Sequence, residues 1–364
     1  MKGNRLIDIF LQLIKIEALS QQEKPVAEHI RDFLIALNLK PYFDKSSSKT
    51  GSDTGNLLCK VGSGGDIMFL AHMDTARPTG GVQPQILSDR ITSDGNSVLG
   101  VDNRAGIAVI LYALEKVLLE KLAVKDFTIA FTTCEESTLA GSLNLEVPDR
   151  IKKCFIFDSS LRPGAFIHSS CGAKNFSVII NGMAAHSGLA PEKGVNSIAI
   201  AAHALSRIKQ GRIDDETTVN IGTISGGSVD NVVPETTQLT GEVRSVEMGM
   251  VDEVLQAIKA IFAEETHARG AGLIFHDEWG FKPYHIGQKT DIYKDIAGVM
   301  VKVGLTPVPV ASLAGSDANS LNGRGIAAIN LGIGAQNPHG NDEFIYKVDL
   351  NKSSEIALEL MKKA

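Results

Sequence analysis

The stretch Phe127-Thr-Ile-Ala-Phe-Thr-Thr-Cys-Glu-Glu136 ends an apolar, strand-like run with two adjacent carboxylates. In open α/β sheets, ligand sites form outside the carboxyl ends of the strands. Neighbouring side chains on an extended backbone point to opposite faces, so Glu135 and Glu136 can serve different functions, one on a metal ion and one on a proton. Glu-Glu pairs are also common on solvated helices and turns. The pair therefore indicates a site only if other polar groups join it.

Other polar side chains occupy similar places along the chain. They are His72 and Asp74 after the run 67–71, Asp102 just before a small-residue helix expected over 103–119, Asp158 after the run 154–157, and His339 in Asn337-Pro-His-Gly340. Each has an ordinary explanation alone; Asp102, for example, is a favoured helix N-cap. Their joint placement at several strand ends is hard to obtain by accident, so we favour a metal site.

The candidate ligands are two imidazoles and several carboxylates, without a thiolate. Such mixed nitrogen and oxygen ligands suit zinc, manganese or cobalt in an open catalytic site. More than four candidate ligands indicate two ions with one bridging carboxylate, an arrangement that can polarise a carbonyl. Asp74 follows His72 by two residues, where it can hydrogen-bond the second ring nitrogen and fix the ring.

The order of expected elements predicts two domains, as does the length of 364 residues. Helices alternating with strands predict an α/β fold with a mostly parallel sheet. The segment 173–281 instead reads strand-helix-strand-strand-helix-strand, a ferredoxin-like α+β module inserted between 1–172 and 282–364. Near the N-terminus, Ser20-Gln-Gln-Glu23 matches a capping box at the start of a helix.

Composition excludes several classes of protein. Hydrophobic content of 43% with 21% charged residues is typical of a soluble globular chain. The net charge of -6 and the lack of a basic run argue against nucleic acid as a partner. No stretch of ~20 apolar residues suggests a membrane span. Four cysteines without CxxC spacing indicate reduced thiols and a cytoplasmic protein.

Several of these motifs together resemble the M20 metallopeptidases, in particular their peptidase T-like, tripeptidase-like branch. The motifs are Ala71-His-Met-Asp-Thr75, Leu99-Gly-Val-Asp-Asn-Arg-Ala-Gly106, Thr133-Cys-Glu-Glu136, Phe157-Asp158, Asn181-Gly-Met-Ala-Ala-His-Ser-Gly188, Gly315-Ser-Asp-Ala-Asn319 and His339. They span nearly the whole chain in the expected order. The resemblance implies a zinc-exopeptidase catalytic domain, made of 1–172 and 282–364, and a lid and dimerisation domain over 173–281.

The resemblance also implies a role for each matching residue. The metal ligands would be His72 and Asp158 on one zinc, Glu136 and His339 on the other, and Asp102 bridging the two. Glu135 would be the general base on a metal-bound water, and Asp74 would orient His72. The peptide bond after Asp102 is expected to be cis.

In the inserted domain, His186 resembles a family histidine that helps to hold the oxyanion, in several members from a neighbouring subunit. A homodimer through this domain is therefore expected. Asn231 and Arg244 are candidate substrate contacts, Arg244 through a terminal carboxylate. A turn asparagine and a surface-strand arginine explain the same two residues equally well.

The resulting hypothesis is a dizinc aminopeptidase acting on di- and tripeptides. The alternative with the same mechanism is a carboxypeptidase or an N-acyl amino acid amidohydrolase of the aminoacylase kind. A catalytically silent peptide-binding protein is a third possibility, against which the intact Glu135 and the intact ligands argue. The chain departs from the commoner family pattern at Ser137-Thr-Leu-Ala-Gly141 and Ser159-Ser160, which leaves the substrate preference open.

Overall fold

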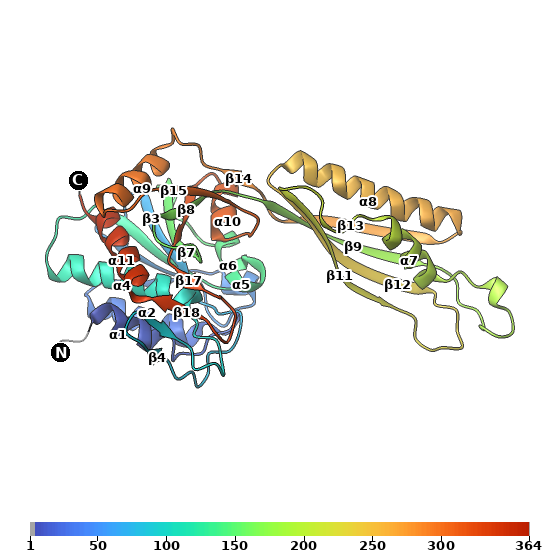
Figure 1. Cartoon of the computed structure of the whole chain (residues 1–364), viewed down its shortest axis with the longest axis horizontal. Coiled ribbons are helices and arrows are strands. Elements are labelled where there is room, and N and C mark those ends of the chain that lie inside the picture. The colour runs from blue at the N-terminus through green and yellow to red at the C-terminus, as the bar shows by residue number, and fades with distance from the viewer. Residues whose placement is uncertain (1–3, 364) are drawn as a thin grey trace. The chain divides into compact units, whose positions relative to one another are not determined.

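The computed structural model describes residues 4–363, which form two compact units (Figure 1). The first unit joins the segment up to Ser169 with His285–Ala311 and the segment from Ser316 onward. The second unit consists of Ser170–Tyr284 and Ser312–Gly315. Within residues 4–363, none of the helices combines the length and the apolar character that a membrane crossing requires.

The first unit is built on a mixed sheet with the strand order β1-β2-β6-β3-β7-β16-β8-β14, and β15 pairs with β8. The strands are β1 (Tyr42–Phe43), β2 (Leu57–Val61), β3 (Ile67–His72), β6 (Phe127–Thr132), β7 (Lys153–Ser159), β8 (Ala165–Ser170), β14 (Tyr284–His285), β15 (Val308–Ser312) and β16 (Ala327–Gly332). Strands β6, β3, β7 and β16 run parallel, whereas β2 and β8 are antiparallel to their neighbours. This confirms the predicted α/β class with a mostly parallel sheet.

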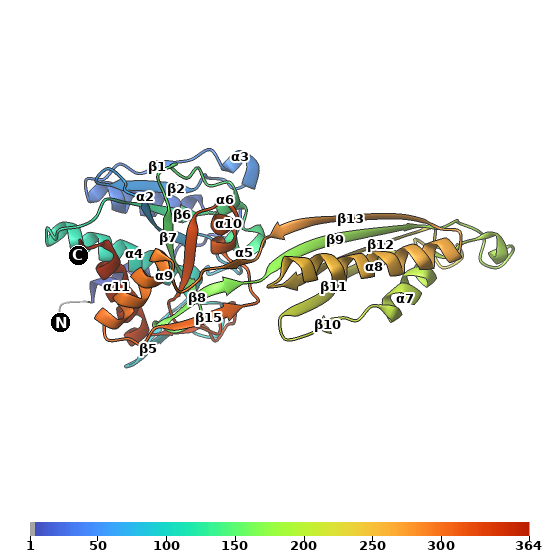
Figure 2. The ribbon, with the colours of Figure 1, turned by 90° about the horizontal axis from the view of Figure 1, so that it is seen from above.

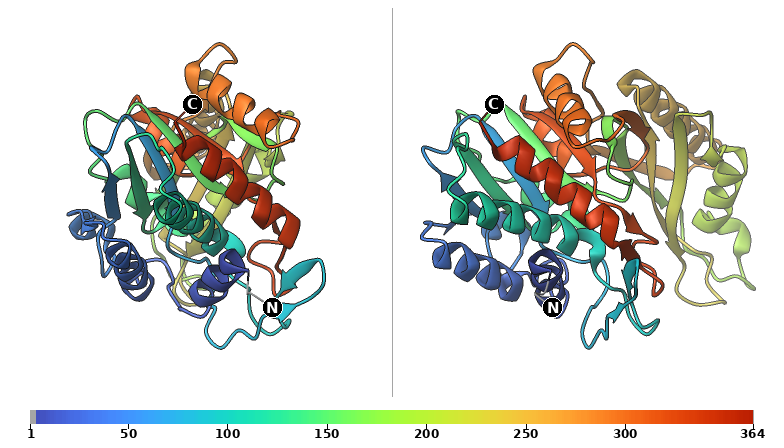
Figure 3. Two further views of the ribbon diagram at one scale, coloured as in Figure 1. Left: turned by 90° about the vertical axis from the view of Figure 1, so that its left-hand side faces the viewer. Right: turned by 60° about the vertical axis from the view of Figure 1, so that its left-hand side comes forward.

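Every residue of β3 and β6 is buried, because both faces of these central strands are covered. The helices of this unit are α1 (Arg5–Leu13), α2 (Lys24–Ala36), α3 (Ser47–Thr50), α4 (Val101–Leu119), α5 (Glu135–Thr138), α6 (Ala140–Leu143), α9 (Asp291–Lys302), α10 (Asp317–Gly323) and α11 (Lys347–Met361). The small-residue helix α4 packs on β3 and β7, and α11 lies beside it (Figure 3). A small antiparallel sheet contains β4 (Gln85–Ile86), β5 (Arg90–Thr92), β17 (Ala335–Gln336) and β18 (Phe344–Tyr346).

The second unit is an antiparallel sheet with the order β10-β11-β12-β9-β13. Its elements are β9 (Gly172–Asn181), the 3-10 helix η1 (Pro191–Lys193), α7 (Ser197–Arg207), β10 (Gly211–Arg212), β11 (Thr217–Gly226), β12 (Thr236–Ser245), α8 (Met248–Ala268) and β13 (Gly272–Phe281). Helices α7 and α8 lie on the same side of the sheet (Figure 2). They bury one apolar core with alternate strand residues such as Phe176, Val178 and Leu239. Element order and strand order are those of the predicted ferredoxin-like module.

The predicted capping box at Ser20-Gln-Gln-Glu23 is wrong. Helix α2 begins at Lys24, its N-cap is Glu23, and no side chain caps it. Gln21 adopts a positive φ of 73°, so the chain turns before the helix starts. The Ser20 hydroxyl donates instead to Asp74 Oδ2 at 2.6 Å. The Ser20 side chain therefore contacts Asp74, close to the end of β3, and does not cap α2.

Candidate metal centre

Candidate ligands from distant parts of the chain meet at one edge of the parallel sheet. Ligand atoms lie within 4.8 Å of one another in two groups, which are His72, Asp102 and Asp158, and Asp102, Glu136 and His339. His72 ends β3 and Asp158 lies near the end of the neighbouring parallel strand β7. The carboxyl ends of such strands form the usual crevice for a ligand. Asp102 belongs to both groups, which is the arrangement that a shared ligand needs.

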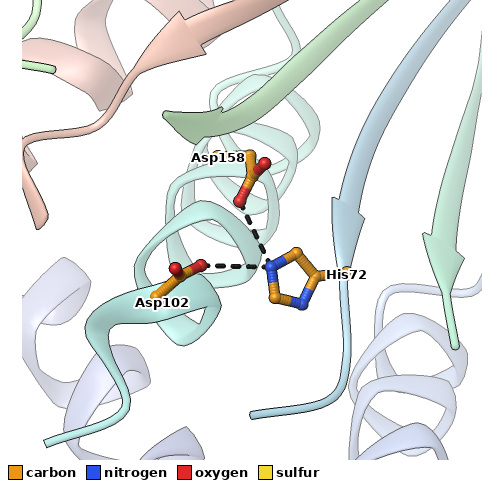
Figure 4. A group of neighbouring side chains, drawn as sticks. All are labelled: His72, Asp102 and Asp158. Atoms are coloured by element: carbon orange, nitrogen blue, oxygen red, sulfur yellow. Dashed lines mark hydrogen bonds and ion pairs between the residues drawn. The ribbon is translucent and has the colours of Figure 1, made fainter. Parts of the chain in front are cut away.

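In the first group, the ring of His72 is held from both sides. Its Nε2 lies 3.1 Å from Asp102 Oδ1 and 3.2 Å from Asp158 Oδ1 (Figure 4). Its Nδ1 lies 3.3 Å from Asp74 Oδ1 and 3.1 Å from the Asp74 carbonyl oxygen. When Nδ1–H donates to Asp74, the lone pair of Nε2 points between the two other carboxylates. Asn330 Nδ2 donates to Asp158 Oδ2 at 3.0 Å and fixes that carboxylate as well.

The second group is more open to solvent. His339 Nε2 lies 3.0 Å from Glu136 Oε2 and 3.5 Å from Asp102 Oδ2, and the His339 side chain is 49% exposed. The backbone N–H of Ala76 donates to Glu136 Oε1 at 3.2 Å. The guanidinium of Arg77 donates to the His339 carbonyl oxygen at 2.9 Å. Ala76 therefore holds the Glu136 side chain, and Arg77 holds the backbone of His339.

The backbone of Glu135 and Glu136 is helical, so the prediction of two alternating strand side chains is wrong. Cys134 has a left-handed φ of 52°, and the pair begins the short helix α5. Their N–H groups donate to Asp74, Glu135 N to Oδ1 at 3.0 Å and Glu136 N to Oδ2 at 3.1 Å. Successive helical side chains differ in direction by ~100°. The two carboxylates still diverge, and Asp74 holds both the His72 ring and the turn that carries them.

Asp102 does not cap its helix. Asn103 Oδ1 accepts the N–H of Gly106 at 3.1 Å, so Asn103 does the capping and the Asp102 carboxylate faces the cluster. The Asp102–Asn103 peptide bond is cis, as the resemblance implied. Gly106 permits the close approach of α4 to β7, because a Cβ there would lie 2.0 Å from the Phe157 carbonyl oxygen. The ordinary explanation of Asp102 as an N-cap is therefore excluded.

Burial and mutual charge dominate the electrostatics of the cluster. Burial raises the pKa of Glu135 well above its ordinary value, against the opposing charge of His72, and burial also raises the pKa of Asp158. For Asp102, hydrogen bonds from His339 and His72 outweigh burial and hold its pKa well below the usual range. The carboxylates raise the pKa of His72 despite its burial, and they raise that of His339 to about 10. The carboxylates outnumber the imidazoles, so this donor set fits divalent cations.

Three buried carboxylates that were not predicted to belong to the site support the cluster. Glu23 Oε1 accepts the N–H of Cys134 at 2.8 Å, Glu343 accepts from the backbone of Gly100 and Asp102, and Asp317 Oδ2 accepts the Thr132 hydroxyl at 2.6 Å. Burial raises the pKa of Asp317 to about 6 and that of Glu343 to about 7. The sequence contained only weak signals for these three residues. Glu23 ends the motif that was interpreted as a capping box, Asp317 lies in the motif Gly315-Ser-Asp-Ala-Asn319, and Glu343 follows His339 in the same loop.

The three residues predicted to contact substrate lie in the second unit and in neither ligand group. His186 Nδ1 accepts the N–H of Gly188 at 3.2 Å, and residue 186 pairs with Val232 in an isolated bridge. The Asn231 carbonyl oxygen accepts the N–H of Ser187 at 3.0 Å, so the two loops lie together. On β12, the Arg244 guanidinium donates to both carboxylate oxygens of Glu242 at 2.9 and 3.0 Å.

Comparison with known proteins identifies the family. The model of the peptidase dimerisation domain of M20 enzymes matches residues 168–269. The uncharacterized protein YqjE of Bacillus subtilis is 30% identical over 99% of this chain and 98% of its own length. The chain belongs to the M20 family of metallopeptidases. Its M20 fold is similar to that of aminopeptidase PepT from Bacillus cereus, with 29% identity, a TM-score of 0.88 and coverage of 98% and 97% of the two chains.

A tripeptidase from Staphylococcus aureus is also similar, with 27% identity, a TM-score of 0.91 and coverage of 98% of this chain and 97% of that one. The predicted M20 membership, with its peptidase T-like character, is thereby confirmed. So is the prediction that the chain is a metallopeptidase.

Proposed function

We propose that this M20 enzyme is a dizinc aminopeptidase that removes the N-terminal residue from tripeptides and dipeptides. The observation that carries the proposal is the pair of ligand groups sharing Asp102, with a mostly buried carboxylate, Glu135, beside them. The structural neighbours named as an aminopeptidase and a tripeptidase support the choice of substrate.

In this proposal His72 and Asp158 hold one ion, Glu136 and His339 hold the other, and Asp102 is shared. The nitrogen and oxygen donors fit zinc, with manganese and cobalt as alternatives. Bound there, two divalent ions would lower the pKa of a coordinated water and polarise a carbonyl. Two ions would also balance the negative charge of the carboxylates, which outnumber the imidazoles. These carboxylates are largely shielded from solvent.

Glu135 is the proposed general base. Its Oε2 lies 4.0 Å from His72 Nε2, so the carboxylate reaches the edge of the first ligand group without replacing a ligand. It would take a proton from the attacking water and give that proton to the leaving amine when the peptide C–N bond breaks. Burial raises the pKa of Glu135, which favours this exchange near neutral pH. Asp74 would fix the positions of Glu135 and His72 relative to each other, since it accepts the Glu135 N–H and lies beside His72 Nδ1.

We assign substrate binding and dimerisation to the predicted lid segment 173–281, which lies in the second unit. We assign catalysis to the predicted domain of 1–172 and 282–364, most of which forms the first unit. Arg244 would bind the terminal carboxylate of the peptide, in competition with Glu242. Asn231 and His186 would contact the substrate amide, His186 at its developing oxyanion. The two loops that carry them contact each other directly, so both side chains would move with one segment.

A homodimer through the second unit is supported by the matching dimerisation-domain family and by the surface of this unit. Its exposed apolar side chains include Met183, Leu189, Ile198, Ile224 and Val229. Met183, Leu189 and Val229 come from the segments around the loops of His186 and Asn231, whereas Ile198 lies on α7 and Ile224 on β11. The four cysteines are buried and none forms a disulfide, which fits a cytoplasmic protein.

The proposal is tested by the hydrolysis of a panel of free di- and tripeptides, with N-acetylated versions of the same peptides as matched controls. The zinc-reconstituted enzyme should cleave the free peptides and release the N-terminal residue, as mass spectrometry of the products would show. Preferential cleavage of the N-acetylated peptides would support an N-acyl amino acid amidohydrolase instead. Release of the C-terminal residue would indicate a carboxypeptidase.

A further inference from the structure

Glu343 is a buried carboxylate that lies between two parts of the metal centre without belonging to either ligand group. It directly precedes β18, and its relative exposure is 1%. Its Oε2 accepts the N–H of Gly100 at 2.6 Å, and its Oε1 accepts the N–H of Asp102 at 3.1 Å. Each oxygen therefore holds one N–H at the beginning of α4, and one of these belongs to the shared ligand.

The backbone of Glu343 is tied to the loop that carries His339. Its N–H donates to the Gly340 carbonyl oxygen at 3.1 Å, and its own carbonyl oxygen accepts the N–H of Ser93 at 3.1 Å. Within the same loop, the Gly340 N–H donates to the Asn337 carbonyl oxygen at 3.1 Å. One residue thus connects the turn containing His339 with the backbone of Asp102.

We propose that Glu343 is a positioning residue, which sets Asp102 and His339 at the separation that the second ligand group requires. The assignment rests on the dizinc centre proposed above. Hydrogen bonds from N–H groups to a carboxylate are short and directional, so they fix the peptide unit from which the Asp102 side chain projects. Groups behind the ligands commonly control metal affinity in this way.

The two ligand groups should depend on Glu343 to different degrees. The second group relies on it twice, through Asp102 and through the His339 loop. The first group relies on it only through Asp102, because His72 and Asp158 lie at the ends of β3 and β7, whereas the Glu343 carboxylate accepts from Gly100 and Asp102. Loss of the Glu343 carboxylate should therefore lower the affinity for one ion much more than the affinity for the other.

The Glu343→Gln variant isolates this function. Glutamine keeps the size of the side chain but replaces one acceptor oxygen with an NH2 group, so two donors would face each other. Glu343→Asp keeps the charge, but its shorter side chain cannot reach both N–H groups. A matched control is Asp349→Asn, since Asp349 is buried in the same unit and accepts two N–H groups of Arg162 at 2.8 Å, away from both ligand groups.

The experiment is equilibrium dialysis of the metal-free full-length chain against Zn²⁺ alone, with circular dichroism to verify folding. Wild type should bind two ions. In Glu343→Gln one ion should bind about 10–100-fold more weakly, while the other ion, and both ions of Asp349→Asn, keep their affinities. If Glu343→Gln does not fold, Glu343→Asp should show the same selective loss.

Two results would overturn the assignment. If wild type binds two ions and the Glu343 variants bind both with unchanged affinity, or lose both to the same extent, the positioning role is wrong while the dizinc proposal stands. If wild type binds fewer than two ions, the dizinc centre itself is wrong, and the assignment falls with it.

Discussion

The candidate functional residues of the two units differ in burial and in how firmly hydrogen bonds hold them. In the first unit the ligand candidates and Glu135 are mostly buried, and buried groups such as Asp74 and Glu343 hold their backbone or side chains. In the second unit His186 and Asn231 lie on exposed loops, and Arg244 is paired with its neighbour Glu242. The groups of the first unit are held in place for catalysis, because they cannot change position without breaking several buried hydrogen bonds. The second unit is suited to binding, because its groups can exchange a partner for a substrate.

The largest effect is expected from Asp102→Ala, since Asp102 belongs to both ligand groups. Peptide hydrolysis should fall to background, and metal analysis of the dialysed protein should show the loss of both ions. Asp66→Ala is a matched control, because that exposed aspartate precedes the opposite end of the same strand, β3. An Asp102→Ala enzyme that keeps two ions and full activity would contradict the shared-ligand assignment.

Glu135→Gln should separate proton transfer from metal binding. We expect kcat to fall by about 10²–10⁴-fold, the usual contribution of a general acid–base group. Both ions should remain, because Glu135 belongs to neither ligand group. Steady-state kinetics on a tripeptide, with metal content measured on the same sample, would check this. Unchanged kcat would show that another group acts as the base.

Asp74→Asn should lower both activity and zinc affinity, because Asp74 orients the His72 ring and the turn that carries Glu135 and Glu136. The amide can accept only one of the two N–H groups of the Glu135-Glu136 turn, and it offers an NH2 group in place of the other oxygen. We expect kcat/KM to fall about 100-fold, the upper range for a residue behind a metal ligand. Zinc affinity should fall with it. If both quantities matched wild type, Asp74 would be a packing residue only.

Arg244→Ala should have the smallest effect and a different character, because it lies in the unit that we assign to binding. KM should rise about tenfold, since a hydrogen bond to a charged group contributes roughly 1.5–3 kcal/mol and Glu242 competes for the guanidinium. The value of kcat and the zinc content should stay near wild type. Arg212→Ala, which removes an exposed arginine of the same unit, is the control. A fall in kcat without a change in KM would contradict the division between the units.

The sequence was sufficient for the fold because its signals are local. Continuous apolar runs such as Ile67–Ala71 predict central strands, and the strand and helix order over 173–281 predicts the ferredoxin-like module. The convergence of His72 with Asp158 also follows from sequence, since both end runs that become parallel neighbours. Long-range hydrogen bonds could not be predicted in the same way, and Glu343 with Asp102 is the clearest case.

Two local interpretations failed for the same physical reason. Residues with positive φ, Gln21 and Cys134, reverse the chain where an uninterrupted pattern was assumed. At the first, Ser20 and Glu23 match a helix cap but serve Asp74 and Cys134 instead. At the second, an extended pair of glutamates becomes a helical one. Neither turn contains the glycine that usually marks such a conformation.

Anomalous diffraction at the zinc absorption edge, from crystals of the zinc-loaded protein, would locate the two proposed ions. We predict two peaks about 3.5–4 Å apart, one beside His72 and Asp158, the other beside Glu136 and His339, with Asp102 in contact with both. A single peak, or peaks away from these side chains, would contradict this prediction.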